Sequence, residues 1–140
     1  MSEAFRRIVA IDPGHHAGWC DWRPDGTIQW GEVDGHSIDV VKTILPSRKS
    51  KVLVAIEGQY KGRMGRRQLM TLVYHRCLWQ VSAEFIGLET ILVAPTTWQS
   101  FHKVKGKPAY MTAASKITGR DMEENEAAAV LIAAYVRETQ

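Results

Sequence analysis

Two short apolar runs, each followed by an acid, dominate the pattern of hydrophobic and polar positions along the chain. The run 52–56 is entirely aliphatic and precedes Glu57, and the run 8–11 precedes Asp12. Runs of this length and composition predict strands that are buried on both faces of a sheet. Because a buried strand has no place for a charge, each acid is expected where its strand leaves the sheet. Ligands of open α/β sheets bind at that edge.

Three further strands complete the predicted sheet, over residues 17–23, 27–32 and 90–94. The segment 23–26, Arg-Pro-Asp-Gly, favours a tight turn between the first two of these strands. The first three strands of the chain are therefore expected to form an antiparallel meander. The two later strands are expected to follow as parallel strands after helical crossovers.

Apolar residues at helical spacing predict four helices, over 34–45, 66–86, 108–117 and from about 122 onward. The segment 66–86 has more apolar positions than one buried stripe needs, and Gly87 is typical of a helix end. Part of this helix packs on a second subunit in one interpretation, and it is a deeply buried core helix in the other. Together the elements predict an α/β fold with helices on both faces of a mixed five-stranded sheet.

Length and cysteine content place the chain in a broad class of proteins. Its 140 residues are enough to bury a core as one domain, 1–140. Cys20 and Cys77 stand alone, without a paired motif, which favours a reduced cytoplasmic compartment. No apolar run approaches the ~20 residues of a membrane span. We expect a soluble cytoplasmic protein with no membrane partner.

Positive charge gathers in two segments, although the formal net charge is only +3. Basic clusters beside a carboxylate site suit a polyanion that is held by its phosphates. Any one charge run is more often an ordinary solvated face, but two clusters that flank one acidic motif favour nucleic acid. The residues concerned are Lys61, Arg63, Arg66, Arg67, Lys103, Lys105 and Lys107.

Three short motifs carry a resemblance to a known family. They are Ile-Asp-Pro-Gly at 11–14, Ala-Ile-Glu at 55–57 and Ala-Pro at 94–95. In identity, order and spacing they resemble the motifs of the RuvC family of Holliday junction resolvases, members of the RNase H-like superfamily. The resemblance spans nearly the whole chain and is greater to the short phage type than to the longer bacterial type.

The resemblance implies roles for several residues. Asp12 and Glu57 match two metal ligands of the family. Tyr60 falls where the family has an aromatic residue that stacks on bases near the junction centre. The basic residues within 61–67 and 103–107 fall where the family contacts the DNA backbone.

The last helix departs from the family pattern, which has two acids three residues apart before an alanine-rich run. A gapless match with that run places the pair on Asn125 and Ala128, neither of which is a strong anionic ligand. A shift of two residues places the pair on Glu123 and Glu126, one helical turn apart on one face. We prefer the shifted pair because it supplies the charge that metal ions need. The alternative is a degenerate, inactive site.

The function implied by the resemblance is metal-dependent cleavage of branched DNA, with paired nicks that resolve four-way (Holliday) junctions. The four acids Asp12, Glu57, Glu123 and Glu126 would hold two Mg²⁺ or Mn²⁺ ions, which prefer hard oxygen ligands. Actin-like ATPases share the fold, but they need two such domains, so no nucleotide cofactor is expected. The non-enzymatic alternative is a module of the same fold that binds branched DNA without cutting it.

A homodimer is expected on geometric grounds. A four-way junction is cut on two strands at symmetry-related positions, and an isologous interface places two identical sites in fixed relation. The predicted helix 66–86 has surplus apolar positions for such an interface. Those proposed for the seam include Leu72, Cys77, Trp79 and Val81.

Overall fold

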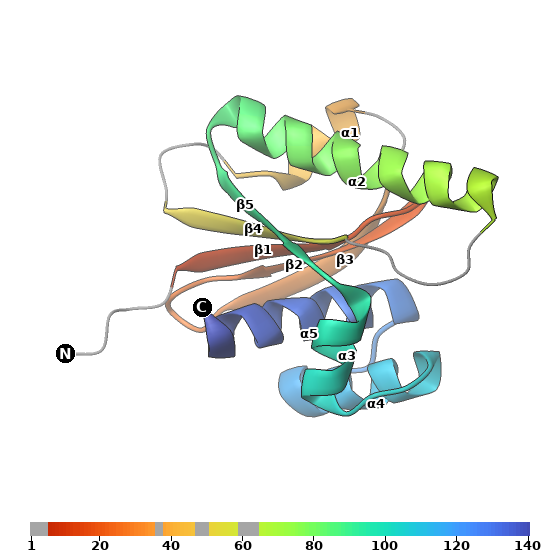
Figure 1. Cartoon of the computed structure of the whole chain (residues 1–140). Coiled ribbons are helices and arrows are strands. Elements are labelled where there is room, and N and C mark those ends of the chain that lie inside the picture. The colour runs from red at the N-terminus through yellow and green to blue at the C-terminus, as the bar shows by residue number, and fades with distance from the viewer. Residues whose placement is uncertain (1–5, 36–37, 47–50, 59–64) are drawn as a thin grey trace.

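A mixed five-stranded sheet lies at the centre of the computed structural model, which describes residues 6–35, 38–46, 51–58 and 65–140 (Figure 1). Its strands lie in the order β3-β2-β1-β4-β5. β2 is antiparallel to both of its neighbours, whereas β4 is parallel to both β1 and β5. This arrangement confirms the predicted meander followed by parallel strands. The bounds are β1 (Arg7–Asp12), β2 (His16–Trp22), β3 (Ile28–Asp34), β4 (Val52–Glu57) and β5 (Glu89–Val93).

The turn between β2 and β3 forms where the sequence predicts it. The backbone N–H of Gly26 donates to the carbonyl of Arg23 at 3.0 Å. The Asp25 carboxylate accepts from the backbone N–H of Thr27 at 2.8 Å. Gly26 has a φ of 92°, a conformation that other residues adopt only with strain.

Helices cover both faces of the sheet. α1 (Ile38–Ile44) and α2 (Arg66–Ile86) lie on one face, and α5 (Glu124–Thr139) lies on the other (Figure 1). α3 (Pro95–His102) and α4 (Lys107–Thr118) pack on α5, so that α5 lies between the sheet and α4. No helix in the described part of the chain is long and apolar enough to cross a membrane.

Helix boundaries follow local signals in the sequence. α2 has the predicted bounds and ends at Gly87, which has a φ of 91° and donates its backbone N–H to Glu84. α1 is shorter than the predicted 34–45, because Asp34 is the last residue of β3 and pairs with His16. The last helix begins at Glu124, two residues later than expected.

Strand alternation divides the core into two layers, because successive side chains of a strand point to opposite faces. In β1, Ile8 and Ala10 pack in the core with α5, whereas Ile11 packs in the core with α2. β4 divides in the same way. Asp12 and Glu57, the last residues of their strands, continue the set that faces α5.

α5 lies unusually close to the sheet. It is rich in alanine, and its residues 127–134 and Val136 are buried. The tightest approach is at Gly18 of β2, where an added Cβ would lie 1.9 Å from the backbone oxygen of Asn125. A side chain at position 18 would therefore push the first turn of α5 away from the sheet.

Candidate active site at the carboxyl edge of the sheet

Asp12 and Glu57 are brought together at the carboxyl ends of β1 and β4. The parallel register pairs Ile11 with Ile56, so the next residue of each strand is an acid. Neighbouring strands lie about 4.8 Å apart, and both acids face α5. The structure therefore places side by side two carboxylates that are 45 residues apart in the sequence.

The surroundings of Asp12 and Glu57 disfavour negative charge. Burial raises the pKa of Asp12 well above its ordinary value, and the charges of Glu57 and Glu124 raise it further, whereas Lys107 lowers it. Burial also raises the pKa of Glu57, against the hydrogen bond from Trp98, which lowers it. Two neighbouring carboxylates that are shielded from water repel each other strongly, and a cation between them would relieve that repulsion.

Glu124, the first residue of α5, is the third acid of the site. Its charge acts on Asp12, and its carboxylate accepts a hydrogen bond from the Lys107 ammonium group at 3.2 Å. The close contact at Gly18, which pairs with Asp12 across β1 and β2, holds this end of α5 against the sheet. The pair of acids expected from the sequence, Glu123 and Glu126, does not include Glu124.

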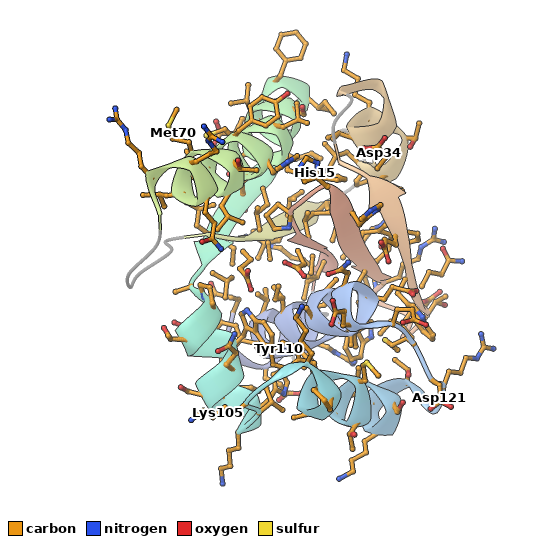
Figure 2. The ribbon with its side chains drawn as sticks, turned by 90° about the vertical axis from the view of Figure 1, so that its right-hand side faces the viewer. His15, Asp34, Met70, Lys105, Tyr110 and Asp121 are labelled. Carbon is orange, nitrogen blue, oxygen red and sulfur yellow. The ribbon has the colours of Figure 1, made fainter. Side chains whose placement is uncertain are left out.

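Glu123 and Glu126 lie at a different place. They line a pocket of about 970 Å³ between α4 and the start of α5. Asp121, at the far end of α4 from Lys105, also lines this pocket (Figure 2). Glu126 is in the first turn of α5, whereas Glu123 is the extended residue before the helix, and both line the pocket on the α4 side. The gapless alternative, Ala128, is buried in the core, and the backbone of Asn125 contacts β2.

Two aromatic residues form the wall of the site next to Glu57. The indole N–H of Trp98, on α3, donates to Glu57 Oε2 at 2.7 Å. The ring of Tyr110, on α4, meets the Trp98 ring edge to face with centroids 4.9 Å apart. Burial raises the pKa of Tyr110, and the charges of Glu57 and Asp12 raise it further. Sequence reasoning assigned no role to either residue.

The donor set suits a divalent cation with hard oxygen ligands. Asp12 and Glu57 supply carboxylates at one point, and Glu124 adds negative charge beside them. Within the described ranges, no three His, Cys, Asp or Glu side chains converge closely enough to form a complete metal cluster. Glu124 instead contacts Lys107, whose ammonium group partly neutralises the site.

The residues predicted to bind DNA divide into three groups. Tyr60, Lys61 and Arg63 lie outside the described residues. Arg66 and Arg67 are exposed at the start of α2. They line a pocket of about 700 Å³, whose other walls are His15, Met70, Thr71, Tyr74 and His75.

The third group lies on the opposite side of the sheet. Lys103 and Lys105 are exposed in the connection between α3 and α4, and Lys107 begins α4. In Figure 2, Lys105 and Tyr110 are on the α4 side of the sheet, whereas His15 and Met70 are on the α2 side. Of the three lysines, the structure brings Lys107 to the acids.

The sheet order, with a long helix on each face, defines an RNase H-like fold. Among solved structures, the chain is similar to Thermus thermophilus RuvC in complex with a Holliday junction substrate, with a TM-score of 0.71 and 17% identity over 91% of this chain and 90% of that chain. It is also similar to a second Thermus thermophilus RuvC structure, with a TM-score of 0.67 and 18% identity over 91% of each chain. The fold is therefore RuvC-like, as the sequence motifs predicted. No protein-family model and no curated protein sequence matches the chain.

Proposed function

We propose that the protein is a metal-dependent nuclease that resolves four-way or other branched DNA junctions. A fold alone does not define a function, so the proposal depends on the site. The observation that carries it is the adjacent pair of shielded carboxylates, Asp12 and Glu57, at the carboxyl edge of a RuvC-like sheet. Support also comes from the similar Thermus thermophilus RuvC structure, which is in complex with a Holliday junction substrate.

Each residue of the site has a role in this mechanism. Asp12 and Glu57 would hold the cations, and Glu124 would add the third negative charge. Bound Mg²⁺ or Mn²⁺, two ions per site, would supply an activated water and stabilise developing charge in phosphodiester hydrolysis. Trp98 and Tyr110 limit the access of water to one side of Glu57. Lys107 neutralises part of the acidic charge until a cation enters.

The exposed basic residues suit contacts with the DNA backbone. Arg66 and Arg67 at the start of α2, with Lys103 and Lys105 between α3 and α4, present cations on the two opposite sides of the sheet. Such contacts hold a duplex by its phosphates and are independent of sequence. They support a substrate that is recognised by shape.

The direct test is cleavage of a synthetic four-way junction by the purified protein. We expect two nicks in strands of like polarity with Mg²⁺, and no cut in a linear duplex of the same sequence. Labelling each of the four strands in turn shows which strands are nicked and where. Tight junction binding without any cut in Mg²⁺ or Mn²⁺ would contradict the proposal. It would favour a module that binds branched DNA, for which the Lys107–Glu124 ion pair is the structural argument.

The proposed nuclease acts as a homodimer through α2. Four large apolar side chains of this helix, spaced four, seven and four residues apart, are exposed on the side away from the sheet. We call them the α2 stripe, and they are Met70, Tyr74, Val81 and Phe85. The most exposed of them is Phe85, at 85%. Exposure of this kind on one helix face is typical of a protein interface. In a symmetric dimer the α2 stripe of each copy would cover the α2 stripe of the other.

The structure corrects one residue of the predicted seam. Trp79 is fully buried in the core between α2 and the sheet, so it is not available to a partner. It lies on the opposite side of α2 from Val81, which is 61% exposed. Leu72 and Cys77 are partly buried. By helical spacing Leu72 lies on the same side of α2 as Trp79, and Cys77 lies on the same side as Val81.

Replacing Val81 and Phe85 together with Glu should convert the dimer to a monomer. Burial of a large apolar side chain contributes about 2 kcal/mol, so the double variant should weaken self-association by on the order of a hundred-fold or more. Light scattering at micromolar concentration measures the change. On a four-way junction the variant should accumulate single nicks. Ile117→Glu, at an exposed apolar position on α4, is the control and should remain dimeric. A wild-type protein that is monomeric both free and on junction DNA would contradict this interface.

A further inference from the structure

Trp98 makes a buried polar contact with one of the two central acids. The residue is 1% exposed, and its Nε1–H donates to Glu57 Oε2 at 2.7 Å. The indole N–H has one proton to donate, and here it is directed at a carboxylate 41 residues away in the sequence. A hydrogen bond to a charged acceptor is stronger than one between neutral groups.

The fold determines the position of this indole. β5 lies beside β4 with Val93 opposite Glu57, and α3 begins two residues later at Pro95. Proline suits the first turn of a helix, so α3 starts immediately after β5, at the carboxyl edge of the sheet. Trp98 is in that first turn, and the ring of Tyr110 packs against it at an interplanar angle of 62°. Burial and the contact with Tyr110 therefore restrict the orientation of the N–H.

We propose that Trp98 is a positioning residue whose hydrogen bond to Oε2 holds the Glu57 carboxylate in the orientation that a divalent cation requires. This inference rests on the proposed function, because it concerns the same site. A free carboxylate can rotate about its last bond and can bind an ion through either oxygen or both. With Oε2 held by the indole, the Glu57 carboxylate is restricted in this rotation. Groups that orient metal ligands in this way commonly contribute about 10- to 100-fold to metal affinity.

The chain provides a matched control for this role. Trp79 is also fully buried, but it lies on the other side of the sheet, in the core with α2. Its Nε1 has no hydrogen-bond partner among the described residues. Trp79→Phe and Trp98→Phe thus remove the same atoms from equally buried places, and only the second removes a contact with an acid.

The test compares Mn²⁺ binding by the wild-type protein, Trp98→Phe and Trp79→Phe, without DNA, by electron paramagnetic resonance of free Mn²⁺. Trp98→Phe should weaken binding about 10-fold or more, and Trp79→Phe should bind like the wild type. The wild-type protein and Trp79→Phe should also show a change of tryptophan fluorescence on addition of Mg²⁺ that Trp98→Phe lacks. Junction binding in Ca²⁺ should be the same for all three proteins.

An isosteric substitution keeps the test decisive if Trp98→Phe fails to fold. Benzothienylalanine at position 98 replaces the indole N–H with sulfur and retains the ring shape, so it should fold and should show the same loss of Mn²⁺ affinity. Wild-type affinity in either position-98 variant would overturn the positioning role and leave the proposed function standing. A wild-type protein whose Mn²⁺ binding is no tighter than that of Asp12→Asn would overturn both.

Discussion

Asp12→Asn is expected to abolish cleavage and, in the same protein, to raise thermal stability in the absence of metal. The substitution keeps the shape of the side chain and removes its charge, so the cation loses a ligand while DNA contacts remain. Loss of a central electrostatic group costs on the order of a thousand-fold in rate. Single-turnover cleavage of a labelled junction measures that loss, and junction binding in Ca²⁺ should be retained.

The stability gain follows from the direction of the Asp12 pKa shift. Burial, Glu57 and Glu124 raise this pKa above the ordinary aspartate value of 3.8. Below that pH the carboxyl is protonated in both the folded and the unfolded chain, and it contributes nothing to the pH dependence of folding stability. As the pH rises past it, the unfolded chain releases the proton first, so the folded state loses stability until its own pKa is passed.

The gain from Asp12→Asn should therefore be absent near pH 3 and should grow toward neutral pH. Each unit of pKa difference corresponds to about 1.4 kcal/mol. For a chain of this size, 1 kcal/mol shifts Tm by about 3–5 °C. Calorimetry across this pH range gives the comparison, and Mg²⁺ should stabilise only the wild-type protein. Asp25→Asn, at an exposed turn, is the control. It should leave cleavage unchanged, and because hydrogen bonds with Thr27 lower the pKa of Asp25, it should give no gain in stability toward neutral pH. A variant that is less stable than the wild type at pH 7 would contradict this account of the site.

Glu124→Gln should reduce metal-dependent cleavage about a hundred-fold, whereas Glu123→Gln and Glu126→Gln should change it by no more than a few-fold. The reason is position, because the charge of Glu124 acts on Asp12 and the other two side chains line the pocket toward α4. The same loss of charge thus has different effects at three neighbouring positions. Removing the Glu124 charge also leaves Lys107 without its partner beside Asp12.

Cleavage rates at saturating Mg²⁺ on one junction separate the two assignments. If Glu126→Gln is the variant that loses activity, the pairing of Glu123 with Glu126 that the sequence favours is the correct one. If all three variants cleave normally, the acids at the start of α5 have no catalytic role, and the site depends on Asp12 and Glu57 alone.

Strand patterns explain why the sheet could be predicted from the sequence. A buried run that ends in an acid fixes both the strand and the sheet edge at which its carboxylate lies, so Asp12 and Glu57 could be placed without a structure. The rotation of α5 about its axis could not be predicted from the sequence. Alanine-rich helices have little difference between their faces, and the helix phase is set by the contact of Asn125 with Gly18.

The aromatic residues illustrate a second limit. Trp98 reads as an ordinary apolar position of a short helix, because its N–H becomes relevant only once α3 is placed beside Glu57. Trp79 is the opposite case, since its place among surplus apolar positions suggested an interface residue, and it is instead a core residue. Periodicity identifies that α2 has two apolar sides, but it does not assign them to the sheet or to a partner.

The contact between Gly18 and Asn125 implies unequal freedom for the two positions during evolution. It is made by the Asn125 backbone, so no exchange of the residue at 125 can create space for a side chain at 18. Position 125 can therefore vary by drift, and position 18 cannot, even though the two residues touch. Among distant chains that keep this close helix, the glycine should persist after the side chains around it have been replaced. It would then be a more durable marker of the acid-bearing helix than the acids themselves.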